Sequence, residues 1–229
     1  EFYTGSADGD SSTQRLTINA GGNVGIGVTP AAFNAASTAV QLSGGHFYDR
    51  TIGETYIGNN IYHDSGDVTR AVNTGLASNI GFYSGNTIFQ SAASVAAGAL
   101  STMVTNMKID ASGRVTMPSQ PAFDVHHSGG SYASGTTVTS LDLNTVRLNR
   151  GNHYSASNDR FIAPVAGVYV FYYRTIISGA YSNLHVRFRA NGSVIPGGDT
   201  HTSPGTAGVW SQISSQILVQ LAVNDYVQV

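Results

Sequence analysis

The sequence predicts an all-β fold, and three observations support this prediction. Charged residues make up 10% of the 229-residue chain, whereas an average soluble domain has roughly 25%. The chain has only two Glu and one Lys, and because these residues fill exposed helix faces, their scarcity argues against helices. Short segments that alternate apolar and polar residues are separated by Gly, Ser and Asn, which favours strands joined by turns.

The same composition limits the partners of the chain. The formal net charge is −2, so the sequence indicates no electrostatic surface for nucleic acid. There is no cysteine, which excludes disulfides and thiolate metal sites. No stretch reaches the roughly 20 apolar residues of a membrane span, so we expect no membrane insertion. With 41% apolar residues and few charges, the chain is expected to bury surface against further copies of itself.

A repeated motif is the first specific feature along the chain. Residues 16–26 (LTINAGGNVGI) have a counterpart at 107–117 (MKIDASGRVTM), and a Pro followed by Ala-Phe comes shortly after each copy. Each copy alternates, turns at Asn/Asp-Ala-x-Gly and alternates again, which predicts a β-hairpin with a four-residue turn. We expect Gly22 and Gly113 to supply the positive φ of this turn. We expect Asn19 and Asp110 to bond its backbone.

These residues resemble a short β module of bacteriophage tail fibres, with the pattern apolar-x-Ile-Asp-x-x-Gly-x-Val-Gly-Ile-Gly-Thr-x-Pro. The first copy matches it closely over residues 23–30 (NVGIGVTP), and the second departs from it at Thr116 and Pro118. The resemblance implies a trimeric fibre that combines β-hairpin modules with a β-rich body. Its expected segments are a hairpin module at 1–33, a trimeric fibre body at 34–106, and a second hairpin module or linker at 107–120.

From about residue 121 the pattern predicts a β-sandwich or jelly roll. The run 165–177 is strongly β-prone, and residues 186–190 alternate apolar side chains with arginines. Residues 217–223 alternate again. Asn191 and Gly192, placed before another short apolar run, predict a tight hairpin turn. Several such strands separated by turn residues are typical of a two-layer β-domain.

This region, residues 121–229, resembles the globular head of C1q, in the C1q/tumour-necrosis-factor jelly-roll superfamily. The string FIAPVAGVYVF at 161–171 carries the match. Its characteristic residues are Phe161, Pro164, Gly167, Tyr169 and Phe171. The resemblance implies a homotrimer in which these residues serve the core and the three-fold interface. The run 169–173 supports this, because it is apolar on both faces of one strand and a neighbouring subunit can cover the second face. The family has two further strands after the position of Val229, so we expect a jelly roll that lacks its last strands.

The sequence predicts a protein without enzymatic activity, cofactor or resident metal. Gly25-x-Gly27 lacks the third glycine and the helix of a dinucleotide loop, which leaves the hairpin interpretation. There is no Gly-x-Ser-x-Gly elbow, and the Asp residues lie mostly beside Gly, Ser or Asn, as turn residues do. His126 and His127 point to opposite faces of a strand. The alternative to two solvent-facing or satisfied rings is a three-histidine metal site on a three-fold axis.

Three residues are candidates for receptor binding, and all three are expected in exposed loops after the Asn191-Gly192 turn. They are Asp199, His201 and Trp210. An aromatic ring beside polar groups is what carbohydrate recognition uses, through stacking and directed hydrogen bonds. The alternative is that Trp210 opens a strand and packs in the core or in the trimer interface.

Three functions from different classes follow from these patterns. The favoured one is a structural and receptor-binding component of a phage tail fibre. It would be part of the virion, act outside the cell, join other tail proteins and bind a host surface glycan or protein. The second is a secreted C1q/TNF-like trimeric binding module of a cellular organism, which predicts a collagen-like or coiled-coil stalk. The third is a polysaccharide-degrading tailspike, which predicts a long parallel β-helix with a carboxylate cluster. The two hairpin modules favour the first.

Overall fold

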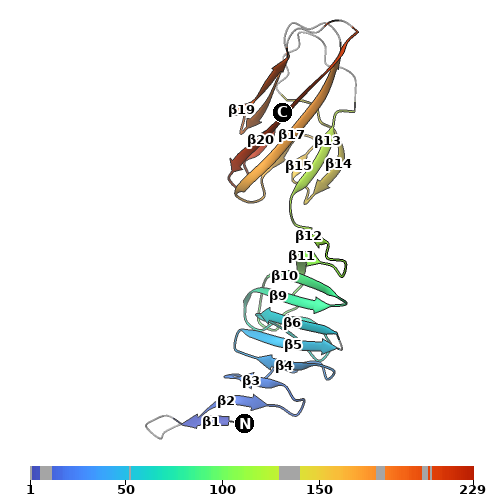
Figure 1. The fold of residues 1–229 in the computed structure, drawn as a ribbon. Coiled ribbons are helices and arrows are strands. Elements are labelled where there is room, and N and C mark those ends of the chain that lie inside the picture. Colours follow the sequence, from blue (N-terminus) through green and yellow to red (C-terminus); the bar gives the residue numbers. More distant parts are fainter. Residues whose placement is uncertain are drawn as a thin grey trace. The chain divides into compact units, whose positions relative to one another are not determined.

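The computed structural model describes residues 2–5, 12–51, 53–128, 140–178, 184–202, 206 and 208–229. The chain divides into two compact units, Glu1–Ser119 (unit 1) and Gln120–Val229 (unit 2). Unit 2 thus begins one residue before the domain start that the sequence predicted at residue 121. Every regular element in the described residues is a β-strand, which confirms the all-β prediction (Figure 1). In this part of the chain no helix is long and apolar enough to cross a membrane.

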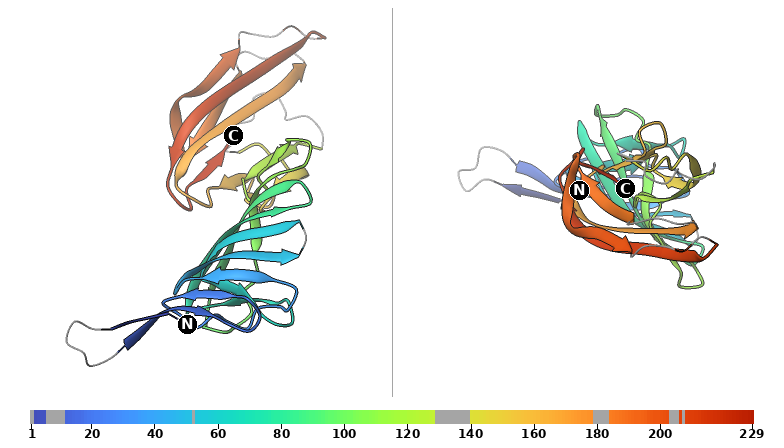
Figure 2. Two further views of the ribbon diagram at one scale, coloured as in Figure 1. Left: turned by 60° about the horizontal axis from the view of Figure 1, so that its bottom comes forward. Right: turned by 90° about the horizontal axis from the view of Figure 1, so that it is seen from above.

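Unit 1 is built on one ten-stranded sheet in which neighbours along the chain are mostly neighbours in space. In sheet order its strands are β1 (Phe2–Gly5), β2 (Ser12–Ile18), β3 (Val24–Ile26), β4 (Thr38–Gln41), β5 (Gly45–Thr51), β6 (Glu54–Asn59), β9 (Gly75–Tyr83), β10 (Asn86–Val95), β11 (Val104–Ile109) and β12 (Val115–Thr116). The pairs are antiparallel except β3 with β4, which run parallel. The left view of Figure 2 shows the same succession of strands from a further direction.

The two predicted hairpins are parts of this sheet and not separate modules. The first is β2–β3, which joins the sheet through β4, and the second is β11–β12, which joins it through β10. In each hairpin the first and last turn residues are hydrogen-bonded to each other, from the Asn19 N–H to the Asn23 carbonyl and from the Asp110 N–H to the Arg114 carbonyl, both at 3.0 Å. The loop therefore has three residues, where the sequence predicted four, and its last residue is a glycine with positive φ.

The turn glycines and the polar residue at the start of each loop have matching geometry in the two copies. Gly22 and Gly113 have φ of 81° and 80°. The Asn19 Oδ1 accepts hydrogen bonds from the Gly21 and Asn23 N–H groups at 3.0 Å. The Asp110 Oδ1 accepts the equivalent pair at 2.9 and 3.0 Å. One side-chain oxygen thus satisfies two backbone donors that the open turn leaves without a strand partner.

One face of the unit 1 sheet is covered by a small hairpin and a loop. The hairpin consists of β7 (Ile61–His63) and β8 (Thr69–Ala71). Its His63 ring stacks on Tyr48 with ring centroids 4.7 Å apart, and Phe33 from the loop before β4 lies 5.5 Å from the same tyrosine. Tyr48 is fully buried. This aromatic cluster is the main core of unit 1.

Two strand glycines make room for these rings. A Cβ on Gly81 would lie 2.5 Å from the Cε1 of Tyr56, and one on Gly58 would lie 2.6 Å from the Cε1 of His46. Real Cβ atoms do not approach ring atoms so closely. A glycine within a strand often marks such a close approach.

Unit 2 is a β-sandwich. One layer is a five-stranded sheet in the order β15 (Tyr154–Ser155), β16 (Arg160–Ile162), β21 (Tyr226–Gln228), β18 (Leu184–Ala190) and β19 (Ser193–Thr202). The other layer holds the pairs β13 (Ala122–His126) with β14 (Thr145–Arg150), and β17 (Gly167–Ser178) with β20 (Trp210–Leu221). Between the layers, Phe161 lies 5.3 Å from Phe123 and 5.4 Å from Phe171, measured between ring centroids.

Candidate functional site

Strand β17 is apolar on both faces, and the sandwich covers one of them. The side chains of Phe171 and Tyr173 point inward and are buried, and burial raises the pKa of the Tyr173 phenol. Val168, Val170 and Tyr172 alternate with them and point outward. The period of two that forms a strand thus leaves a second apolar face without cover in one copy of the chain.

The paired strand β20 widens this outer face. Val170 lies opposite Leu218, Val168 opposite Gln220 and Tyr172 opposite Gln216. Val168, Val170, Tyr172 and Leu218 are 59–66% exposed. Among the described outward side chains of the two strands, Arg174 is the one charged group. We call this surface the β17–β20 outer face.

The residues characteristic of the resemblance lie on the core side of this strand or just before it. Phe161 and Phe171 are in the core, while Pro164 is half-buried in the turn that precedes β17. Gly167 begins the strand, and the Tyr169 hydroxyl donates a 2.8 Å hydrogen bond to the Val165 carbonyl. The outward residues Val170 and Tyr172 lie in the run 169–173, which was expected to be apolar on both faces of one strand. Val168 and Leu218 were not singled out from the sequence.

Two of the candidate receptor-binding residues belong to a polar patch on the outer surface of β18 and β19. Arg187 Nε lies 3.2 Å from an Asp199 carboxylate oxygen, and His185 Nδ1 lies 3.9 Å from the other. The His185 and His201 rings stack with centroids 5.4 Å apart. Asp199 and His201 therefore lie within a strand, contrary to the predicted loop position. Strand pairing brings them beside His185 and Arg187, which sequence reasoning missed because cross-strand neighbours depend on register.

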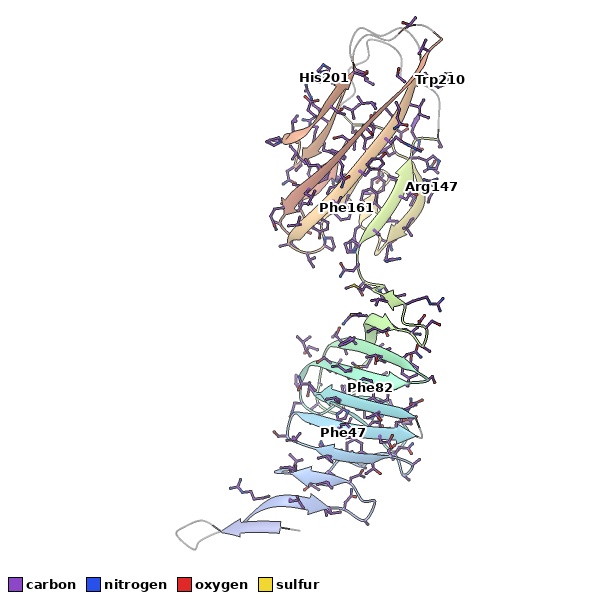
Figure 3. The ribbon with its side chains drawn as sticks, viewed as in Figure 1. Phe47, Phe82, Arg147, Phe161, His201 and Trp210 are labelled. Carbon is purple, nitrogen blue, oxygen red and sulfur yellow. The ribbon has the colours of Figure 1, made fainter. Side chains whose placement is uncertain are left out.

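Trp210 also lies in a strand and not in a loop, because it is the first residue of β20. It pairs with Ser178 in the layer opposite His201 and is 72% exposed. This exposure excludes the predicted packing in the core of one copy. Figure 3 shows the labelled Trp210 and His201 at the same end of unit 2.

A comparison with protein-family models finds the C1q domain in residues 122–229. This part of the chain is a C1q domain. No curated protein matches the sequence. The match confirms the predicted C1q-like jelly roll, and C1q domains are typically non-enzymatic binding modules that commonly form trimers.

The Asn191-Gly192 turn of the C1q domain joins β18 to β19, the edge strand of the five-stranded sheet. Asn191 and Gly192 have φ of 48° and 80°, the left-handed pair that a two-residue hairpin requires. The Asn191 Nδ2 donates to the Asp225 carboxylate at 2.8 Å, and its Oδ1 accepts from the Tyr226 N–H at 3.0 Å. The turn is thereby tied to the β20–β21 connection and has a structural explanation.

The histidines near the start of the C1q domain form no multidentate site within one copy. His126 ends β13, and the His127 Nδ1 lies 2.7 Å from the Asp142 carbonyl oxygen. In the described ranges, no group of three or more His, Asp or Glu is placed to hold a metal ion. A site shared by three copies stays a prediction.

Unit 1 contains a pair of buried histidines that the sequence did not single out. His46 and His63 are at most 7% exposed, with ring centroids 6.5 Å apart. Burial, and to a smaller extent the neighbouring His63, lower the pKa of His46 to about 4, and the Ile61 backbone acts in the opposite direction. Burial also lowers the pKa of His63. Both rings are therefore neutral core residues at pH 7.

Proposed function

We propose that the chain is a structural and receptor-binding part of a bacteriophage tail fibre, which attaches the virion to the host surface as a homotrimer. The observation that carries this proposal is the combination in one chain of two β-hairpin modules, built into a long single sheet, with a C1q domain. The hairpins resemble fibre modules, and the C1q domain supplies a binding module at the other end of the sequence. The function is binding, without catalysis.

The β17–β20 outer face supports the homotrimer. Four of its large apolar side chains, Val168, Val170, Tyr172 and Leu218, are more than half exposed, and a monomer gains nothing from holding them in one contiguous strip. Contact with two further copies removes this strip from water without adding charge to the interface. C1q domains commonly form trimers, so the proposed state agrees with the domain type.

Receptor binding is assigned to the end of the C1q domain that carries His201 and Trp210. On one layer a largely exposed indole provides a flat stacking surface for a sugar ring, and on the outer surface of the other layer the His185–Arg187–Asp199–His201 patch provides directed polar groups. Three such ends in one trimer, and several trimers on one particle, convert weak contacts into lasting attachment through effective concentration.

Two other functions make different predictions. A tailspike hydrolase would have a long parallel β-helix, whereas the unit 1 sheet is antiparallel apart from β3–β4. A secreted C1q module of a cellular organism shares the C1q domain and the trimer. It would bind a soluble or animal-cell ligand and would show no preference for bacterial envelopes.

The deciding experiment combines mass and cell binding. The purified chain is measured by light scattering and then, with a fluorescent label, by flow cytometry on a panel of intact bacterial strains and on animal cells. We expect three times the chain mass, binding to a narrow set of bacteria, and no reducing sugar released from their envelopes. A monomer, binding restricted to animal cells, or steady release of sugar would each overturn the proposal.

A further inference from the structure

The exposed face of the unit 1 sheet carries one apolar side chain on each of eight successive strands, all at the same level. The strand register places each of them opposite the next, from β2 to β11. We call this set the apolar row. Its members are Ile18, Val24, Val40, Phe47, Ile57, Ile80, Phe89 and Met107.

The row lies on the face that the β7–β8 hairpin does not cover. Phe47 and Ile57 alternate along their strands with the buried Tyr48 and Tyr56, so they point away from the aromatic core. Ile18, Phe47 and Ile57 are 49–58% exposed. Figure 3 marks Phe47 on β5 and Phe82, a further exposed apolar residue of this face, on β9.

The row is long enough to serve as a protein interface. Eight strands spaced about 4.8 Å apart make a line about 34 Å long. A continuous apolar line of this length differs from the single scattered apolar residues of an ordinary monomer surface, and contiguous apolar surface marks an interaction site.

The residues that flank the row indicate how further copies of the chain would pack against it. Two residues further along the strands on one side are Gly45, Asn59, Ser78 and Ser91, which pair with one another in the same register. On the other side lie Asp49, Thr55, Phe82 and Thr87. Two sheets packed face to face would bury these mostly polar flanks, whereas three sheets around an axis bring the central row together and leave the flanks nearer to solvent.

We infer that the apolar row is a second self-association surface, where the sheets of three copies of this chain meet around a common axis. The occupant is a further copy because each copy presents a row of the same length and the same spacing from strand to strand, so the contact is matched along its whole length. The inference rests on the proposed homotrimer, since one symmetry axis has to serve both interfaces. It adds that unit 1 holds the trimer independently of the C1q domain.

A cysteine placed in the row tests this directly, because the chain has no other cysteine. Ile57→Cys in the full chain is treated with a short bismaleimide at low protein concentration and run on a denaturing gel. Three thiols around one axis are expected to give cross-linked products that contain at least about two thirds of the chains. Ser65→Cys, an exposed position in the β7–β8 turn, is the matched control and is expected to stay uncross-linked.

A second variant separates this inference from the proposed function. Ile57→Cys is combined with Val170→Glu and Leu218→Glu, which place charge on the β17–β20 outer face. Cross-linking that persists in the combined variant supports an independent unit 1 interface. If the Ile57→Cys single variant is a trimer but does not cross-link, the inference is overturned and the proposed function stays intact. A chain that is monomeric before any substitution overturns both.

Discussion

Leu218 lies among the exposed apolar residues of the β17–β20 outer face, opposite Val170, and its truncation measures what this face contributes to assembly. In one copy the side chain is 66% exposed and makes little contribution to the core. Leu218→Ala should therefore leave the folding of a single C1q domain nearly unchanged, within about 0.5 kcal/mol. The substitution should instead weaken the free energy of association between copies.

The expected magnitude follows from the exposed fraction. Complete burial of a leucine side chain is worth about 1.5–3 kcal/mol, so burying two thirds of it contributes about 1–2 kcal/mol in each copy. A trimer contains three such residues, which gives about 3–6 kcal/mol. At 1.4 kcal/mol for each factor of ten, the trimer dissociation constant should rise by about 100- to 10,000-fold.

Sedimentation equilibrium over a wide concentration range gives this constant. Val194→Ala is the control, because Val194 is also an exposed apolar residue of the C1q domain but lies on β19 in the opposite layer. It should leave the constant within a factor of about three. Equal effects of the two substitutions, or a Leu218→Ala trimer as tight as the wild type, would refute the assignment of the interface to this face.

Three further predictions concern unit 1. In a urea titration, Gly81→Ala should destabilise unit 1 by about 1–3 kcal/mol, because the new methyl group meets the Tyr56 ring. Gly44→Ala is the control and should have little effect, because the nearest atom to its new methyl group lies 3.9 Å away. The folded-state pKa of His46 is lowered to about 4 from 6.5, so as the pH falls the unfolded chain takes up the proton before the folded chain does. The contribution of this histidine to stability should therefore be complete above pH 6.5 and fall by about 2 kcal/mol between pH 6.5 and 5. His46→Gln should lose most of this dependence and keep the part due to His63, and an unchanged pH profile would count against the buried neutral ring. Asn19→Ala removes the acceptor of two backbone N–H groups and should cost about 1 kcal/mol, whereas Asn19→Asp keeps the oxygen and should cost much less in the same assay.

The fold class and the local turns could be predicted from the sequence because they depend on short-range chemistry. Scarce Glu and Lys argued against helices, and the Asn/Asp-Ala-x-Gly pattern placed Gly22 and Gly113 at positions of positive φ. The predicted turn was one residue too long, because the first turn residue also closes a backbone hydrogen bond with the last. The two hairpins were expected as separate modules, but free strand edges pair with whatever strand lies beside them, and both became parts of one sheet.

The interaction surfaces could be predicted only in part. The run 169–173 was expected to be apolar on both faces of one strand, and the structure has both faces. The apolar row was not predicted, since its successive members are 6 to 23 residues apart in sequence and are aligned only by strand register. The neighbours of Asp199 were missed for the same reason. Residues that face each other across a sheet carry no local signal of that fact.

The distribution of residues along the β17–β20 outer face suggests how one small domain can both associate and bind a receptor. Val168, Val170 and Leu218 lie toward the Gly167–Leu221 end of the strand pair, whereas Arg174 lies opposite Ser214 and Trp210 opens β20 at the other end. An interface centred on Arg174 would have to bury a charge, which costs several kcal/mol unless a partner is supplied. We therefore expect subunit contact to be tightest at the Leu218 level and to open toward Trp210, although Ile176 extends the apolar surface in that direction. The indole and the His201 patch then remain accessible in the assembled trimer, so the interface and the proposed receptor site need not compete for the same surface.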